Sequence, residues 1–429
     1  MIRGRQWAIA MTAAAILAAA PAWPAGFGIF EQGTRAMGLA GAFTAQADDG
    51  SALFHNAAGI AFATERQFQV GATLITSSEA DFNGASPFPG EGVYEEQEKL
   101  FETPPHVYWV QPLGPTWRFG LGVNAPFGLT TDWKNKDEFT GRWISTKAAL
   151  QTIDINPTLG VQLTERFGIG IGAIARFSDV ELNRYLPFPN PLNGQLVDVG
   201  RVKLSSDTDT GYGFNVGILH KVNNSFSWGL SYRSAIKIDY GGDATFTQIL
   251  TGIPPLDAAV GQVIPFGQKV PVKTEIEFPD VASLGVAFAL SPTMTLEIDA
   301  NWTGWSSFDS IPQTFVGYPH LSSVLPEDWD DVYNYRAGLR WKTRPDTEWR
   351  FGYVYDETPQ PEKGASPLLP DENRNGFTVG WGHEFSKTTL DLAVMYLPFD
   401  ERVVKNESED SYFGSYNTTA WLFGVTLGF

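Results

Sequence analysis

Cysteine is absent from this 429-residue chain, and long unbroken apolar runs are absent after residue 25. Without cysteine there is no disulfide, no thiolate metal site and no cysteine nucleophile. Positive charge is scarce: 30 Lys and Arg stand against 48 Asp and Glu, and the formal net charge of -18 excludes nucleic-acid binding through phosphate neutralisation. The mean hydropathy of -0.14 and the lack of a run of about 18 apolar residues exclude a helical membrane protein.

The first residues read "MIRGRQWAIAMTAAAILAAAPAWPAGFGIF". Arg3 and Arg5 precede a short apolar run from Ala8 to Ala20, and small residues follow. This order is typical of a secretory signal peptide rather than a buried or anchoring helix. We therefore predict a signal peptide over 1–25, with cleavage after Ala22 or after Ala25.

The rest of the chain is rich in glycine, with 44 residues, and in aromatics, at 14%. The chain closes with the segment "TTAWLFGVTLGF". One face of this segment carries Trp421, Phe423, Val425, Leu427 and Phe429, and the other face carries Leu422, Gly424, Thr426 and Gly428. A period of two is the pattern of a β-strand with one apolar face. The same pattern predicts about fourteen strands, starting near residues 66, 104, 116, 148, 166, 208, 225, 277, 293, 331, 348, 374, 388 and 417.

The connections between these strands alternate strictly between short and long. Short turns such as "LGPT" and "VNNS" are followed by long polar loops. The long loops are predicted near 78–103, 130–147, 186–207, 240–276, 306–330, 357–373 and 400–416. An up-and-down sheet with one short-turn end and one long-loop end is typical of an outer-membrane barrel.

A secreted β-sandwich is the alternative fold, and aromatic residues at the strand ends argue against it. A membrane barrel places such residues in girdles at the two interfaces. The residues in question are Trp109, Trp117, Trp228, Trp341, Trp349, Trp381 and Trp421. The predicted fold is therefore all-β, a fourteen-stranded transmembrane barrel over 66–429 whose last strand pairs with its first.

Residues 26–65 do not alternate and are rich in Gly and Ala. A barrel of about fourteen strands has an interior too wide for side chains alone to fill. We therefore predict that this segment is an N-terminal hatch inside the lumen.

The segment "AGFGIFEQGTRAMGLAGAFTAQADDGSALFHNAAGIA" resembles the hatch of the FadL family of outer-membrane fatty-acid and hydrocarbon channels. The resemblance continues through "NAPFGLTTDW", "YRSAIKIDY", "GWSSFDS" and the closing "AWLFGVTLGF". Where the family carries Asn-Pro-Ala at the hatch turn, this chain has Asn56, Ala57 and Ala58. The resemblance implies a passive channel with an outer capture groove, a second ligand site near the hatch N-terminus, and a sideways exit through the wall.

On this resemblance, Gly26, Phe27, Ile29 and Phe30 of the hatch N-terminus are expected to bind ligand. The loop "TTDWKNKDEFTGRWISTK" also carries apolar residues between charges. Apolar residues exposed on an outer loop often mark a binding site. Trp133, Phe139, Trp143 and Ile144 either form the outer capture groove or pack within their own loop.

Arg184, at the predicted end of the fifth strand, stands where the family carries a basic residue that contacts the ligand headgroup. Charge-assisted hydrogen bonds from an Arg would favour a carboxylate. The alternative is an ion pair with Glu181 or with a loop acid. Some relatives carry a second basic residue at a position that falls near Leu325 in this chain. Because the basic residue is missing here, a fatty-acid carboxylate is disfavoured and an uncharged hydrocarbon is favoured.

The lateral exit is predicted beside "VNAPFGL". Pro126, Phe127 and Gly128 fall within the predicted third strand, and Pro157 is predicted to interrupt the next one. Proline cannot donate to a strand ladder and glycine marks bulges. These residues therefore form the candidate lateral gate.

Other chemistry is thin. "DENRNG" spaces its oxygens like half of a calcium loop but lacks the closing Glu, and five separated histidines have no serine nucleophile motif beside them. We predict no enzyme activity, no metal and no cofactor. The expected partners are hydrophobic small molecules, outer-membrane lipid and lipopolysaccharide, and we expect a monomer. An adhesin or phage receptor on the same barrel, and an aqueous porin, are the alternatives.

Overall fold

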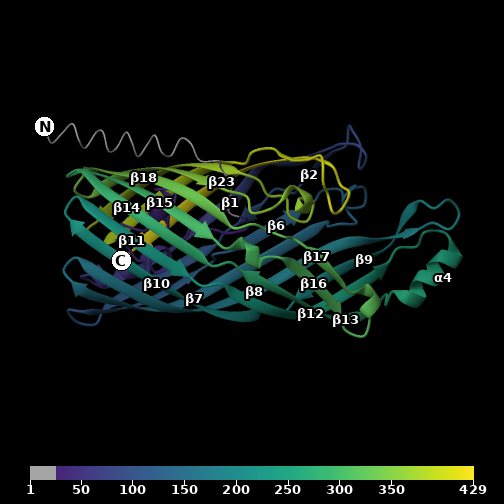
Figure 1. The fold of residues 1–429 in the computed structure, drawn as a ribbon, viewed down its shortest axis with the longest axis horizontal. Helices are drawn as coiled ribbons and strands as arrows, with labels where there is room; N and C mark the ends of the chain where they lie inside the picture. The colour runs from purple at the N-terminus through teal and green to yellow at the C-terminus, as the bar shows by residue number, and fades with distance from the viewer. Residues whose placement is uncertain (1–25) are drawn as a thin grey trace.

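The alternating segments form the wall of a closed antiparallel barrel in the computed structural model, which describes residues 26–429 (Figure 1). The predicted signal peptide over 1–25 lies outside these residues. The fourteen wall strands are β1 (Gln67–Gly84), β4 (Pro105–Pro112), β5 (Trp117–Asn124), β7 (Lys147–Thr164), β8 (Phe167–Pro189), β10 (Asp209–Asn223), β11 (Phe226–Arg233), β14 (Val281–Ser291), β15 (Met294–Thr303), β18 (Val332–Arg344), β19 (Thr347–Asp356), β20 (Arg374–Phe385), β21 (Thr388–Pro398) and β23 (Gly414–Gly428).

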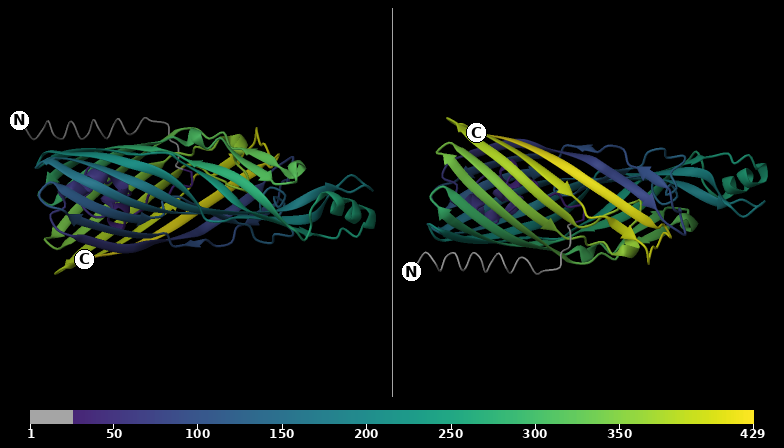
Figure 2. Two further views of the ribbon diagram at one scale, coloured as in Figure 1. Left: turned by 90° about the horizontal axis from the view of Figure 1, so that it is seen from below. Right: turned by 90° about the horizontal axis from the view of Figure 1, so that it is seen from above.

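Each wall strand pairs with the next one in this order, and β23 pairs with β1 to close the barrel. Val70 lies opposite Leu427 in that last ladder. The backbone N–H of Phe429 donates to the carbonyl of Phe68 at 2.8 Å. Closure satisfies the backbone groups of both edge strands, which lipid could not do. The strands cross the barrel at a tilt (Figure 2).

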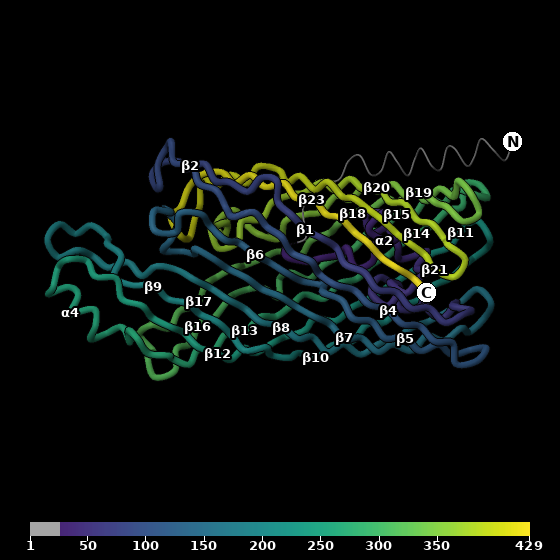
Figure 3. The backbone as a smooth tube through the Cα atoms, turned by 180° about the vertical axis from the view of Figure 1, so that it is seen from behind, coloured from purple at the N-terminus to yellow at the C-terminus, as the bar shows by residue number. Residues whose placement is uncertain are grey.

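The long connections are more ordered than the sequence suggests. Three predicted polar loops contain strands that extend the sheet from β8 through β9, β12, β13 and β16 to β17, beyond the barrel wall. The helix α4 (Pro254–Val263) lies at the tip of this extension (Figure 3). The additional strands are β2 (Tyr94–Glu96), β3 (Phe101–Glu102), β6 (Gly128–Asp132), β9 (Leu196–Ser206), β12 (Ile236–Gln248), β13 (Lys269–Phe278), β16 (Ser310–Phe315), β17 (Ser323–Pro326) and β22 (Arg402–Val404).

The N-terminal segment lies inside the lumen near the short-turn end, where it carries α2 (Thr34–Met37), α3 (Ala52–His55) and the 3-10 helix η1 (Ala57–Phe62) (Figure 2). Three further 3-10 turns lie in the long connections: η2 (Trp305–Ser307), η3 (Pro319–Leu321) and η4 (Glu362–Gly364). Among residues 26–429 no helix has both the length and the apolarity to cross a membrane.

Glycines on the inner faces of the strands let the hatch approach the wall. A Cβ on Gly170 would lie 2.3 Å from the carbonyl of Ala57, and one on Gly352 would lie 2.4 Å from the backbone N of Ala40. Both distances are far below van der Waals contact, so any side chain there would displace the hatch backbone. The glycine face that alternation assigns to the lumen therefore exists because another backbone packs against it.

Candidate functional site

The wall is broken next to β5. This strand ends at Asn124, and β6 resumes at Gly128, so Pro126 and Phe127 lie in a kink between two strands that both pair with β7. The prediction that Pro126 and Gly128 lie within one strand was wrong, because the chain leaves the ladder for three residues. The prediction for Pro157 was wrong in part. The strand β7 runs through Pro157, which pairs with Leu121, and only the ladder to β8 is interrupted there.

The hatch N-terminus provides hydrogen-bond partners for the backbone groups of residues 125–128 that have no partner in a strand ladder. The N–H of Ile29 donates to the carbonyl of Pro126 at 2.8 Å, and the N–H of Gly128 donates to the carbonyl of Phe27 at 3.1 Å. The carboxamide of Gln32 donates to the carbonyl of Ala125 at 2.6 Å and accepts from the N–H of Ala125 at 3.2 Å.

On the β7 side of the kink, the hydroxyl of Thr152 replaces a backbone partner. It accepts from the N–H of Phe127 at 3.0 Å and donates to the carbonyl of Phe127 at 2.7 Å. Two side chains and one strand-like piece of the hatch thus satisfy the backbone at the kink. The kink can therefore persist without a neighbouring strand on its free side.

Beyond the kink, β6 has a free edge. Between Leu129 and Thr131 its backbone bonds only to β7 within the described residues, and a side-chain bond of 3.0 Å from the hydroxyl of Thr130 to the carboxylate of Glu102 crosses the gap to β3. A cavity of about 520 Å³, here called the larger cavity, borders this edge. It is also lined by hatch residues 26–31, including Gly26, Phe27, Ile29 and Phe30, by β1 and by residues 97–105.

A second cavity, of about 120 Å³, adjoins the larger one and is here called the apolar pocket. The two share the side chains of Phe27, Leu129, Leu150 and Leu369 in their linings. Residues of β7, β8, β9, β12, β13 and β16 make up most of the rest, among them the apolar side chains of Val180, Leu204, Tyr240 and Ile276.

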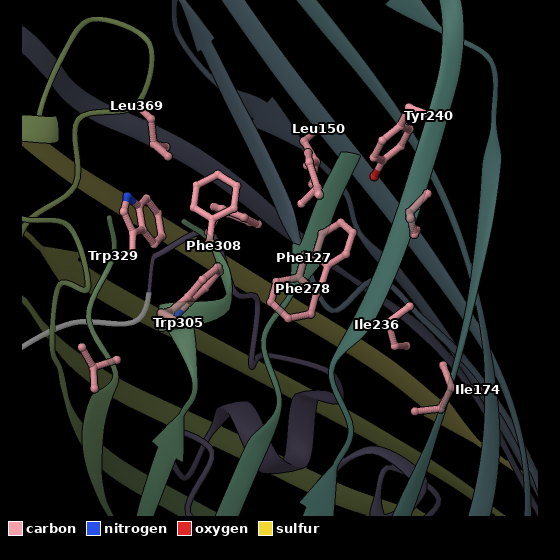
Figure 4. Close-up of a cluster of buried hydrophobic side chains, with 14 residues drawn as sticks. Phe127, Leu150, Ile174, Ile236, Tyr240, Phe278, Trp305, Phe308, Trp329 and Leu369 are labelled. Atoms are coloured by element: carbon pink, nitrogen blue, oxygen red, sulfur yellow. The ribbon is translucent and has the colours of Figure 1, made fainter. Parts of the chain in front are cut away.

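Phe27 lines both cavities and belongs to a cluster of aromatic rings. Figure 4 shows other members of this cluster, including Phe127, Trp305 and Phe308. The ring centroid of Phe27 lies 4.7 Å from that of Trp305, 5.3 Å from that of Phe308 and 6.0 Å from that of Phe127. Edge-to-face contacts of this kind favour an ordered cluster. The hatch N-terminus therefore borders both cavities through Phe27.

Glu327 brings one carboxyl group into the lining of the apolar pocket. One of its oxygens accepts a hydrogen bond from the indole N–H of Trp329 at 3.0 Å. Burial raises the pKa of Glu327 to about 8, and the nearby carboxylates Asp410, Glu409 and Asp328 act in the same direction. The group is therefore mostly uncharged at neutral pH.

The aromatic residues of the loop after β6 pack inside the outer loops. Trp133 is fully buried, stacks on Phe139 with the ring centroids 4.6 Å apart, and donates to the carbonyl of Pro367. Ile144 packs against the same cluster, and the indole of Trp143 donates to Asp198 at 2.6 Å. None of these four predicted ligand residues lines the larger cavity or the apolar pocket.

Arg184 lies inside β8, which continues to Pro189, so the prediction that it ends a strand was wrong. The alternative pairing with Glu181 is also absent, because Glu181 binds Lys147 at 3.2 Å and Lys203 at 3.1 Å. The Nε of Arg184 is buried without a hydrogen-bond partner, and Asp410 is the acid whose charge acts on it. Arg184 lines neither the larger cavity nor the apolar pocket.

The predicted hatch turn is well bonded without its proline. The Oδ1 of Asn56 accepts from the N–H of Ala58 at 3.1 Å and so caps η1, while its amide donates to Thr44 at 2.7 Å and to Ile218 of the wall at 3.0 Å. Ala57 and Ala58 are buried beside it.

Charged groups fix the rest of the hatch to the wall. The N–H groups of Phe43 and Thr44 donate to one carboxylate oxygen of Asp299, at 3.0 and 2.9 Å. Arg35 of the hatch lies 3.8 Å from Glu348, and Asp48 lies 2.5 Å from Arg340. Charge-assisted bonds across a low-dielectric interior are the strong ones, so the hatch is held firmly.

Sequence reasoning missed Gln32, Thr152 and Glu327. Gln32 and Glu327 lie in irregular segments, where no periodicity assigns a direction to a side chain. Thr152 does follow the inward alternation of β7, and a polar residue on that inward face was the available signal. Among residues 26–429 no group of three or more His, Asp or Glu is placed to hold a metal ion.

Comparison with known proteins completes the description of this site. The model of a family described as "Outer membrane protein transport protein (OMPP1/FadL/TodX)" matches residues 15–429. A long-chain fatty acid transport protein of Escherichia coli O6:H1 is 25% identical, over 98% of this chain and 97% of that protein. Outer membrane protein P1 of Haemophilus influenzae is 23% identical, over 90% of this chain and 89% of that protein.

Solved structures share the fold. A FadL homologue of Pseudomonas aeruginosa has a TM-score of 0.81 at 20% identity, covering 94% of this chain and 99% of its own. The toluene transporter TodX of Pseudomonas putida has a TM-score of 0.67 at 17% identity, covering 88% of this chain and 93% of its own.

Proposed function

The chain belongs to the OMPP1/FadL/TodX family of outer-membrane transport proteins, and we propose that it is a passive channel for long-chain fatty acids or similar hydrophobic compounds. It is accordingly an integral outer-membrane protein and a transporter rather than an enzyme. Its curated relatives include proteins named for long-chain fatty acid transport, and its structural neighbours include toluene transporters.

The observation that carries the proposal is the connection from the apolar pocket to a gap in the wall. The two cavities share Phe27, and the larger one reaches the free edge of β6. Apolar side chains line most of the apolar pocket and its boundary with the larger cavity, and the larger cavity, which also carries acidic groups, leads to the free edge of β6. A hydrophobic molecule that leaves through this edge gains free energy, because it passes from the barrel interior into lipid.

In this proposal residues 26–65 act as the hatch and 66–429 as the barrel, with Gly26, Phe27, Ile29 and Phe30 in contact with the ligand. Pro126, Phe127 and Gly128 shape the exit, and Pro157 weakens the adjacent ladder. The outer-loop aromatic residues and Arg184 line neither cavity, so in this proposal they shape the outer loops that ligand meets before it reaches the apolar pocket.

The natural surroundings follow from the barrel. We propose that the protein acts as a monomer among outer-membrane lipid and lipopolysaccharide, because one chain contains both cavities and the gap. No second subunit is needed to complete the path.

A cross-link across the gap tests the lateral exit. The chain has no cysteine of its own, so Glu102→Cys with Thr130→Cys provides the only thiol pair. The side chains replaced are in hydrogen-bond contact across the opening. A short thiol-to-thiol linker should block uptake of radiolabelled toluene in host cells that lack their own family member, and a cleavable linker should restore uptake on reduction.

Two controls separate closure from damage. Each single cysteine variant receives the same reagent, which tests for added bulk. The pair Val379→Cys and Val394→Cys faces lipid at directly opposed positions of β20 and β21, away from the gap. Linking that pair should leave uptake unchanged. If the protein with positions 102 and 130 fully linked took up toluene at the wild-type rate, the exit would not lie at this gap.

A further inference from the structure

The lining of the apolar pocket contains no Lys, Arg or His side chain. It contains two carboxyl groups. One is Glu181, which two lysines already neutralise, and the other is Glu327, whose only hydrogen bond is the one from Trp329. A ligand carboxylate in this pocket would therefore lose its water without gaining a cation, and burying an unpaired charge is strongly unfavourable.

The larger cavity has the same electrostatic bias. Two cationic side chains line it, Lys99 and Arg374, and Arg374 already binds Asp356 at 3.3 Å. Six carboxyl residues line the same cavity: Glu31, Glu98, Glu102, Asp132, Asp356 and Asp371. An anion that left the apolar pocket would thus enter a predominantly acidic space on its way to the gap.

The size of the apolar pocket narrows the ligand further. Its volume of about 120 Å³ is close to that of dry apolar cavities of about 150 Å³ that hold one benzene ring. Resting on the function proposed above, we propose that this pocket selects uncharged hydrophobic ligands with the bulk of a single aromatic ring, that it rejects carboxylates, and that the lack of a cation in its lining sets this preference. An uncharged carboxyl at this place can also donate to, or accept from, a ligand hydroxyl.

Binding of a matched pair of probes tests the proposal. The full-length protein in lipid nanodiscs is titrated with para-fluorotoluene and with para-fluorobenzoate at neutral pH, and fluorine NMR follows both, with empty nanodiscs as background. We expect para-fluorobenzoate to bind about tenfold or more weakly than para-fluorotoluene, because its charge has no partner. Equal affinities in the wild type would overturn the proposal.

Variants test whether the missing cation sets the preference. Glu327→Lys should reduce the preference for the uncharged probe by about tenfold or more, because it adds the missing cation, and Glu327→Gln should stay close to the wild type. Leu325→Arg, which adds a cation to the same lining, is the second variant if the first does not fold. Heat-modifiable migration on a gel reports folding of each.

The matched control is Asp207→Lys, which makes the same type of charge change at an exposed position outside the apolar pocket. It should bind both probes as the wild type does. If Asp207→Lys and Glu327→Lys changed the ratio of the two probe affinities equally, the preference could not be attributed to the lining of the apolar pocket. If para-fluorotoluene binds but cells take none up, the transport function fails and the pocket inference stands. If both probes bind equally and are taken up equally, the transport function stands and the pocket inference fails.

Discussion

Gln32 should decide whether the kink beside β5 persists. Its side chain is 1% exposed and bonds to both the N–H and the carbonyl of Ala125. The same amide donates to the carbonyl of Ile29 at 3.1 Å, within the hatch strand that bonds to Pro126. Gln32→Ala removes all three bonds and changes no residue of the wall.

The expected cost follows from the two groups left without partners. A buried backbone donor or acceptor that loses its partner costs about 1–3 kcal/mol, so Ala125 alone accounts for about 2–6 kcal/mol. Ala125 borders the larger cavity, where water can reach it, so we take the lower end of this range. About 2 kcal/mol still changes the ratio of two conformations by roughly 30-fold.

The kinked conformation should therefore lose its advantage over a straighter strand in which Ala125 bonds within the ladder. We expect Gln32→Ala to take up radiolabelled toluene several-fold more slowly than the wild type, with the same amount of folded barrel in the membrane. Gln46→Ala is the matched control, because this other hatch glutamine makes no hydrogen bond to residues 125–128 and should leave uptake unchanged.

A second measurement shows whether the hatch itself has moved. Entry of a large hydrophilic antibiotic should be the same for Gln32→Ala and the wild type, because the charged contacts of the hatch remain. Normal toluene uptake by a folded Gln32→Ala barrel would refute the reasoning that the hatch holds the exit open.

Four other predictions test the hatch, the barrel and Glu327. Deletion of residues 27–60 should produce a barrel that conducts small ions in planar bilayers, and a deletion variant that stays closed would contradict the role of the hatch. Asp299→Asn weakens two charge-assisted bonds to the hatch backbone, so single-channel recordings should show brief openings that the wild type lacks. Unheated and boiled samples should migrate differently on a gel, and identical migration would exclude a stable barrel. Binding of para-fluorotoluene should weaken as pH rises through the pKa of Glu327, about 8, because the ionised carboxylate resists loss of water, while Glu327→Gln should show no such change.

The wall of this protein could be predicted from the sequence because its pattern is local. Alternation over a few residues assigns Phe167, Ile169 and Ile171 to lipid and the glycines between them to the lumen, and the structure confirms both faces. The predicted strand starts differ from the observed ones by no more than a few residues. In lipid every backbone group must be paired, so once the strands are known, only a closed barrel remains.

The candidate site was predictable only in part. Pro126 and Gly128 marked a weak place in the wall because proline and glycine restrict pairing wherever they stand. The strands within the long connections, such as β9 and β12, were missed because their apolar residues pack on one another across 186–276 rather than on lipid.

The sequence by itself therefore determined the fold class, the number of strands, the faces of the wall and the presence of a separate hatch, since each depends on neighbours along the chain. Only the tertiary structure decided what holds the kink and what lines the path. Gln32 meets Ala125 across 93 positions of sequence, and Glu327 lines one pocket with Phe27, which lies 300 positions earlier in the sequence. No periodicity records such encounters, because they depend on where the hatch lies inside the closed barrel.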